Sequence, residues 1–140
     1  MQRAIELDPG YADAYSGLAD ALFALGTFLP PRAIVPDAAA AIRRAVEIEP
    51  ENVEARVSLA RLESEYFWDF EAAEAGFRRA LADRPDDVLA HRRYAVHLVY
   101  RGREDEAIAL LRDAHTIDPL DPAILANLGW ALLMDGRTDE

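Results

Sequence analysis

The sequence predicts an all-α fold, and three observations support this prediction. Ala, Leu, Glu and Arg are abundant, and all four favour helices. Side chains recur at the i, i+3, i+4, i+7 spacing that places them on one helical face, as at His91, Tyr94, Ala95 and Leu98. The second helix of each predicted pair ends at an acidic or basic residue followed by proline, which disfavours the helical conformation in the residue before it. The chain is therefore predicted to be a series of short amphipathic helices.

These helices recur in a fixed register. The prolines that end them, Pro9, Pro50, Pro85 and Pro119, lie 41, 35 and 34 residues apart. An alanine stands five residues before each proline. Before the last three prolines, a large apolar residue stands at eight residues and another alanine at twelve; the three sets are Ala38, Ile42 and Ala45, Ala73, Phe77 and Ala80, and Ala107, Leu111 and Ala114. A period near 34 residues predicts a stack of helix pairs, each of which needs its neighbours to bury its apolar face.

This pattern resembles the tetratricopeptide repeat (TPR), whose first helix carries Leu, Gly or Ala, and a large residue in the order seen here. The matching positions are Tyr15, Leu18, Ala19 and Leu22, then Leu59 and Ala60, then Tyr94, Ala95 and Leu98, then Leu125, Leu128, Gly129 and Leu132. The resemblance implies an α-α superhelix of antiparallel helix pairs, with about seven helices after an N-terminal helical stub. Arg56, Glu63 and His91 depart from the motif, so we expect those positions to be less buried.

The register divides the single TPR segment, residues 1–140, into successive parts. These are the end of a preceding repeat at 1–9, repeat one at 10–50, repeat two at 51–85, repeat three at 86–119, and the first helix of a truncated repeat four at 120–140. Repeat one carries seven extra residues, and Pro30, Pro31 and Pro36 argue against helix there. We therefore expect a loop insertion at 26–36 and a helix at 38–48.

The turn of repeat two carries one extra residue and several aromatic residues, among them Phe67, Trp68 and Phe70. Two interpretations are open. These rings pack over the ends of neighbouring helices, or they form an exposed aromatic knob for a partner.

Composition argues against several classes of function. The net charge is −11, and all 15 basic residues are arginine. The absence of lysine and cysteine removes Schiff-base, P-loop, thiolate and disulfide chemistry. His91, His97 and His115 have no metal-ligand spacing, so we expect no enzyme activity, no cofactor and no metal. The acidic balance disfavours nucleic acid, and no apolar run is long enough to span a membrane. Without a targeting signal, we expect a cytoplasmic protein.

The resemblance implies that a partner binds along the first helices. The positions that face the groove give these candidate residues: Arg61, Arg92, Val96, Val99, Tyr100, Trp130, Leu133 and Met134. An apolar groove suits an amphipathic helix or an extended peptide. An alternative interpretation is that further repeats cover these residues, or that they only fill the interior of the superhelix.

An acidic chaperone C-terminus is not an expected partner. The residues at the five carboxylate-clamp positions of chaperone-binding TPR domains are Ser16, Asp20, Ser58, Leu89 and Arg93, of which only Arg93 fits.

The expected function is a protein–protein interaction scaffold within a larger bacterial signalling or regulatory protein. Stretches such as PPRAIVP and IDPLDPAILANLGWAL are similar to TPR arrays attached to winged-helix regulators, adenylate cyclases and Ser/Thr kinases. One alternative is a sensor segment that relays ligand binding to an attached catalytic or DNA-binding domain. Another is an architectural or oligomerisation segment, in which Leu125, Leu128 and Leu132 are left without a covering helix and drive end-to-end self-association.

Overall fold

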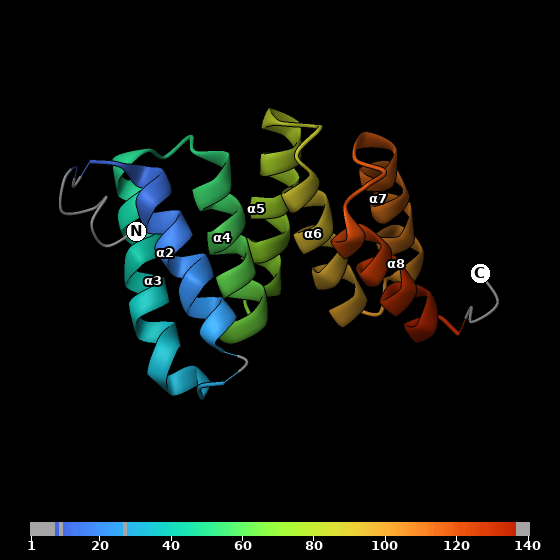
Figure 1. The fold of residues 1–140 in the computed structure, drawn as a ribbon, viewed down its shortest axis with the longest axis horizontal. Helices are drawn as coiled ribbons and strands as arrows, with labels where there is room; N and C mark the ends of the chain where they lie inside the picture. The colour runs from blue at the N-terminus through green and yellow to red at the C-terminus, as the bar shows by residue number, and fades with distance from the viewer. Residues whose placement is uncertain (1–7, 9, 27, 137–140) are drawn as a thin grey trace. The chain divides into compact units, whose positions relative to one another are not determined.

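The computed structural model describes residue 8 and residues 10–26 and 28–136, and all regular secondary structure in this part of the chain is helical (Figure 1). The seven α-helices are α2 (Ala12–Leu25), α3 (Pro31–Ile48), α4 (Val53–Leu62), α5 (Phe70–Asp83), α6 (Val88–Tyr100), α7 (Glu104–Ile117) and α8 (Pro122–Met134). The predicted all-α solenoid is confirmed. The expected N-terminal stub lies outside the described residues.

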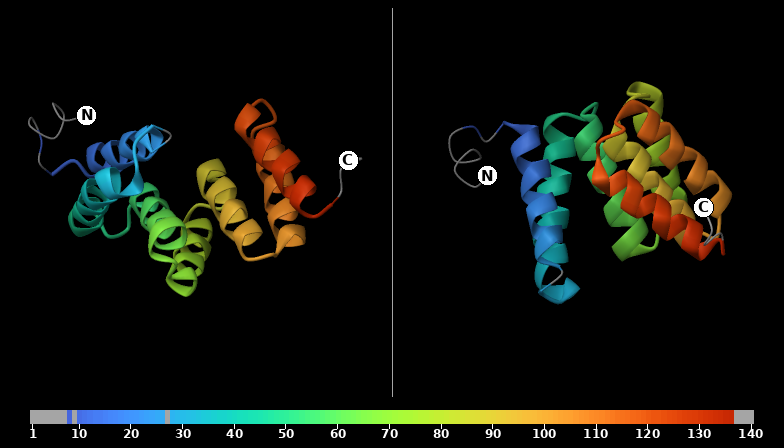
Figure 2. Two further views of the ribbon diagram at one scale, coloured as in Figure 1. Left: turned by 90° about the horizontal axis from the view of Figure 1, so that it is seen from below. Right: turned by 45° about the vertical axis from the view of Figure 1, so that its right-hand side comes forward.

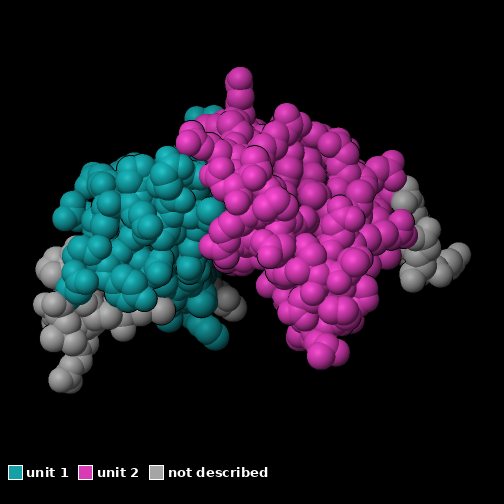
Figure 3. All heavy atoms as spheres, turned by 90° about the horizontal axis from the view of Figure 1, so that it is seen from above, with its two compact units in different colours: residues 1–69 teal, residues 70–140 magenta. Residues whose placement is uncertain are grey.

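The chain divides into two compact units, residues 1–69 and 70–140, which are described separately (Figure 3). In the first unit α2 packs against α3, and α4 packs against both. Its core combines small and large side chains, with Ala19, Phe23, Ile42 and Leu62 all buried. The Phe23 and Tyr66 rings stack with centroids 5.4 Å apart. Alanine at the helix contacts allows close approach, while the larger residues fill the space between helices.

The expected loop at 26–36 is wrong from Pro31 onward, because helix α3 begins there. Helix α3 runs for 18 residues from Pro31 to Ile48. Pro31 occupies the first helical position, where a missing N–H costs nothing. Pro36 lies inside the helix and forfeits one backbone bond, but Ile34 is buried and offsets that loss. Gly26 permits the close approach, since a Cβ there would lie 2.9 Å from Ile34 Cδ1.

The extra residue of repeat two is accommodated in a π-helical turn, η1 (Glu63–Phe67), which continues α4. A π turn absorbs one inserted residue without ending the helix. Trp68 ends the turn with φ at +57°, a left-handed conformation that is costly for a residue other than glycine. The Asp69 N–H donates to the Glu63 carbonyl at 2.9 Å and closes the segment.

In the second unit α6 packs against α5, α7 and α8, and α7 also packs against α8 (Figure 2). Asp87 and Asp121 cap α6 and α8 by accepting bonds from Ala90 N and Ala123 N. Gly102 joins α6 to α7 with φ at +67°, as expected of a helix C-terminus. Each cap bonds one N–H that a helix start leaves unpaired, which defines the ends of the two helices.

Two of the three polar residues expected to be less buried are buried. Arg56 is 9% exposed and His91 is 6% exposed, whereas Glu63 is half-buried. The Arg56 guanidinium donates to the Pro50 carbonyl at 2.8 Å and pairs with Glu51. Its aliphatic stem is thus covered while the charge is satisfied near the surface.

Candidate binding surfaces

Helices α6 and α8 are joined at both ends. Near their N-termini, Arg92 Nη1 lies 3.4 Å from Asp121 Oδ2. Near their C-termini, the rings of Tyr100 and Trp130 meet edge to face with centroids 5.8 Å apart. The N-terminal part of α6 contacts the N-terminal part of α8, and the C-terminal parts also contact each other. The two helices therefore run parallel and present one continuous surface.

This surface becomes apolar towards the helix C-termini. Tyr100, Leu133 and Met134 are 57%, 61% and 55% exposed, while Val96 and Trp130 are half-buried. We call these five residues the α6–α8 face. Val99 was expected in the same groove, but it is 5% exposed and so offers a partner little area.

Arg61 belongs to the other unit, and its charge is already engaged. Its Nε lies 3.2 Å from Glu65 Oε2, its Nη1 lies 3.8 Å from Asp20 Oδ1, and its guanidinium lies 4.3 Å from the centre of the Phe23 ring. A guanidinium that pairs with two carboxylates and stacks on an aromatic ring stabilises local packing. Arg61 is therefore not part of the α6–α8 face.

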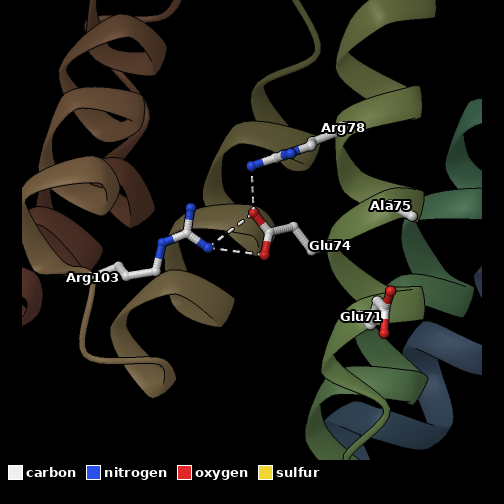
Figure 4. A pocket seen from close by; sticks show the side chains of 5 residues that line it. All are labelled: Glu71, Glu74, Ala75, Arg78 and Arg103. Carbon is white, nitrogen blue, oxygen red and sulfur yellow. Dashed lines mark hydrogen bonds and ion pairs between the residues drawn. The ribbon is translucent and has the colours of Figure 1, made fainter.

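A second feature of the unit that holds α6 and α8 is an ion-pair network around Glu74 of α5 (Figure 4). Glu74 accepts two bonds of 2.9 Å from Arg103 Nη1, pairs with Arg78 Nη2 at 2.7 Å, and accepts the Tyr94 hydroxyl at 3.0 Å. Arg103 also binds Glu106 at 2.7 Å. A hollow of about 380 Å³ lies here, and its lining residues are Glu71, Glu74, Ala75, Arg78 and Arg103.

The charges and hydrogen bonds of this network favour the ionised form of Glu74. Burial opposes ionisation of Glu74, but the hydrogen bonds from Arg103 and Tyr94 and the nearby arginine charges hold its pKa below the ordinary value of 4.5. A carboxylate with a lowered pKa is a weak base near neutral pH. The network joins α5, α6 and the start of α7. Sequence spacing shows the Glu74–Arg78 pair, since these residues lie at i, i+4 on one helix, but gives no sign of the Glu74–Arg103 pair 29 residues apart.

His97 lies in an aromatic cluster. Its ring centre lies 5.7 Å from that of Phe77 and 6.1 Å from that of Phe70. Burial lowers the pKa of His97, and Arg101 and Arg103 lower it further against the opposing effect of Glu74. A neutral histidine inside an aromatic cluster is a core residue.

The residues expected to drive self-association lie on α8. Leu125 is 52% exposed, Leu128 is half-buried and Leu132 is 8% exposed. The first two therefore retain apolar surface that a second molecule can contact.

The turn aromatics separate into two environments. Phe67 and Trp68 are 48% and 74% exposed. Phe70 is half-buried, with the Arg101 guanidinium 4.7 Å from its ring centre. The packing interpretation therefore fits Phe70, and the exposed-knob interpretation fits Phe67 and Trp68.

The described residues hold neither a cluster suited to a metal ion nor a helix suited to crossing a bilayer. They contain no group of three or more His, Asp or Glu side chains placed to hold a metal ion. None of their helices combines the length and hydrophobicity that crossing a bilayer requires.

Residues 69–122 match the tetratricopeptide repeat family. PilF from Pseudomonas aeruginosa is 25% identical with a TM-score of 0.71, over 90% of this chain and 54% of that chain, so the present chain spans about half of its length. TTC0263, a thermophilic TPR protein from Thermus thermophilus, is 22% identical with a TM-score of 0.77, over 94% and 69%. MamA is 19% identical with a TM-score of 0.66, over 99% and 76%.

Comparison with curated protein sequences gave no match. The repeat match covers residues 69–122, and the structural likenesses show that the chain shares the helical-repeat fold of tetratricopeptide-repeat proteins. The TPR fold generally mediates protein–protein interaction, and proteins built from it are generally non-enzymatic scaffolds.

Proposed function

We propose that this chain is a protein-interaction module that binds an apolar helix or extended segment of a partner on the α6–α8 face. The single observation that carries the proposal is the exposure of Tyr100, Leu133 and Met134 beside the edge-to-face Tyr100–Trp130 pair. Large aromatic rings bury much area at low entropic cost, and such clusters dominate binding energy at protein interfaces.

The polar end of the two helices restricts where a partner can bind. Arg92 is already paired with Asp121, so its charge contributes no free cation to a partner. Binding is therefore concentrated at the C-terminal halves of α6 and α8. A partner helix with apolar residues at i, i+3 or i+4, and i+7 presents a matching stripe.

A photo-crosslinking experiment tests this proposal. A photoreactive residue replaces Leu133, and a matched control variant carries it at Ala109, which is exposed on α7. After irradiation in cells, we expect a discrete protein adduct from position 133 that is absent from position 109. Tyr100→Ala or Trp130→Ala, introduced beside the photoreactive group, should each weaken partner binding by about 2 kcal/mol or more, roughly 30-fold in Kd.

Circular dichroism melts of each variant separate lost contacts from lost folding. Equal adducts at positions 133 and 109, or adducts that survive both aromatic substitutions, would show that this face is not the binding site.

Self-association is a second candidate function, and the 52% exposure of Leu125 favours it. Sedimentation velocity over a wide concentration range tests it directly. A concentration-dependent increase in sedimentation that Leu125→Ser abolishes would support self-association, and a constant monomer would reject it.

Four other expectations remain predictions. The chain is part of a larger bacterial signalling protein, it relays ligand binding to an attached domain, it is cytoplasmic, and it does not bind nucleic acid, a membrane or an acidic chaperone C-terminus. Burial of Ser16 and Ser58 supports the last of these, because neither hydroxyl is accessible to a peptide carboxylate.

A further inference from the structure

The first turns of α3 and the π-helical turn η1 border a hollow in the first unit. It has a volume of about 280 Å³, and a closed cavity of about 150 Å³ is enough to bind benzene, so one aromatic ring fits. We call it the α3–η1 hollow. Its lining is apolar or aromatic apart from one arginine, and the lining residues are Pro31, Arg32, Val35, Pro36 and Tyr66.

The walls of the α3–η1 hollow are held in place before anything binds. The Tyr66 ring stacks on Phe23 with centroids 5.4 Å apart and planes within 8° of parallel. Val35 packs against the same core as Tyr66. The two proline side chains are closed rings and lose no rotamer freedom on binding. A ligand therefore meets a preformed site, which lowers the entropic cost of binding.

Two polar groups of Arg32 lie at this hollow without a partner in the fold. Pro36 has no N–H to donate to the Arg32 carbonyl four residues earlier, so that acceptor lacks its usual helical partner. The Arg32 guanidinium is exposed and forms no hydrogen bond or ion pair with the described residues. The hollow therefore suits an aromatic ring with one N–H donor and a carboxylate nearby. Indole is the side chain that combines an apolar ring with a single donor.

The same unit presents such an indole on its surface. Trp68 is 74% exposed, and its side chain forms no hydrogen bond or ring contact with the described residues. Its backbone has φ at +57°, which is costly for tryptophan and which glycine would relieve. The segment Glu63–Asp69 around it carries three carboxylates and no basic residue. Strain that is retained at an exposed aromatic residue is typical of a functional position.

We propose that the α3–η1 hollow binds the Trp68 indole of a second copy of this chain. The ring fills the hollow, its Nε1–H donates to the Arg32 carbonyl, and the carboxylate of Asp69 approaches the Arg32 guanidinium. Tyr66 of the hollow and Trp68 are two residues apart, so two copies can exchange indoles about a two-fold axis, which closes the assembly at a dimer. This contact is separate from the α6–α8 face and from Leu125, and it does not depend on either.

The size of the contact sets its strength. An aromatic side chain buries about 150–250 Å². Two exchanged rings therefore bury much less than the roughly 1,600 Å² of a stable interface. We expect a weak dimer with a Kd on the order of 0.1 mM. The net charge of −11 makes copies repel one another, so the assay is run at about 0.15 M salt, where distant charges are screened.

The test uses the full chain with Trp130→Phe, which leaves Trp68 as the single tryptophan. Concentrations from about 10 μM to about 1 mM bracket the expected Kd. As the chain dimerises, the Trp68 emission should shift to the blue and acrylamide should quench it less. Sedimentation equilibrium over the same range gives the Kd.

Two arginines of α3 provide a matched control for the charge. Arg32 and Arg43 are both exposed and neither is paired within the described residues, but Arg43 does not line the hollow. Arg32→Glu and Arg43→Glu change the net charge equally. Arg32→Glu should weaken the dimer about 10-fold or more, because it places a carboxylate opposite Asp69, while Arg43→Glu should leave the Kd within about threefold.

Two substitutions at Trp68 separate binding from folding. Trp68→Phe keeps a ring but removes the N–H donor, and it should weaken the dimer about threefold or more. Trp68→Gly removes the ring and relieves the left-handed strain, so it should abolish the dimer without lowering the Tm measured by circular dichroism.

Four outcomes would overturn the proposal. One is a chain that stays monomeric at the highest concentration, which would show that a second copy does not fill the hollow. Another is a dimer that survives Trp68→Gly. Equal weakening by Arg32→Glu and Arg43→Glu would assign the effect to general charge repulsion. A dimer that Leu125→Ser dissociates, with Trp68 emission independent of concentration, would place the contact on α8.

Discussion

Helices α6 and α8 occupy equivalent places in successive repeats, yet the more polar helix is the better buried. Helix α6 carries four arginine and histidine residues and buries His91 and His97, whereas α8 carries no arginine or histidine and leaves Leu125 and Leu133 exposed. Burial in a repeat stack is therefore decided by which neighbours a helix has, more than by its own hydrophobicity.

Two polar side chains of helix α6, those of His91 and Tyr94, have hydrogen-bond partners that offset the cost of their burial. The His91 Nδ1 lies 2.9 Å from the Asp87 carbonyl, one turn earlier. The Tyr94 hydroxyl donates to Glu74 and accepts from Arg78 Nε, both at 3.0 Å. A buried polar group with partners costs little, whereas one without them costs its full desolvation penalty.

The largest expected effect comes from truncating the same motif position in both helices. Tyr94 is 7% exposed and stacks on Phe77 with ring centres 5.6 Å apart, while its counterpart Leu128 is half-buried. We expect Tyr94→Ala to lower the free energy of unfolding by about 3–4 kcal/mol. Leu128→Ala should cost about 1 kcal/mol, because much of its side chain remains in water.

Urea denaturation monitored by circular dichroism measures both changes. Similar losses for the two variants would contradict the difference in burial between α6 and α8.

A second prediction concerns the Glu74 network, which ties α6 to α5 and to the start of α7. The Glu74 side chain is 21% exposed. Glu74→Gln should lower the free energy of unfolding at pH 7 by about 1–2 kcal/mol, because it weakens the bonds to Arg103 and Tyr94. The pKa of Glu74 is lowered in the folded chain, so this stabilisation is present above the unfolded pKa, near 4.5.

The stabilisation is lost as the pH falls through the folded pKa of Glu74. The difference between wild type and Glu74→Gln should therefore shrink from pH 5 to pH 3. Paired urea titrations across that range test the sign. A difference that grows on acidification would show that Glu74 is not stabilised as a carboxylate.

These features differ in how far the sequence predicts them. Helical periodicity predicts the series of short helices, and Gly102 and Pro122 stand at the end of α6 and the start of α8, positions that these residues favour. The start of α3 was missed because Pro31 and Pro36 argue against helix locally, whereas burial of Ile34 outweighs that cost only in the folded unit. Local rules describe one segment at a time, and tertiary packing can override them.

The site is less predictable than the fold for a related reason. Register places Tyr100 and Trp130 on equivalent faces of two helices, so their contact is an expected consequence of the repeat. Register also placed Val99 in the groove, where it is in fact covered. Whether a position is open depends on the neighbouring helix, and a single repeat motif carries no information about where that neighbour is missing.

The smallest expected effect is a change in the free energy of unfolding that has opposite signs at one motif position, Ala95 in α6 and Gly129 in α8. Ala95 is fully buried, so Ala95→Gly removes a packed methyl group and adds backbone freedom, with an expected loss of about 1–2 kcal/mol. At Gly129 a new methyl group meets no neighbour, so Gly129→Ala gains no packing. It still restricts the unfolded chain and favours helix, and we expect it to raise the free energy of unfolding by about 0.5–1 kcal/mol. Urea denaturation at pH 7 resolves both signs. Because position 129 is open, a destabilising Gly129→Ala would mean that another helix already covers α8.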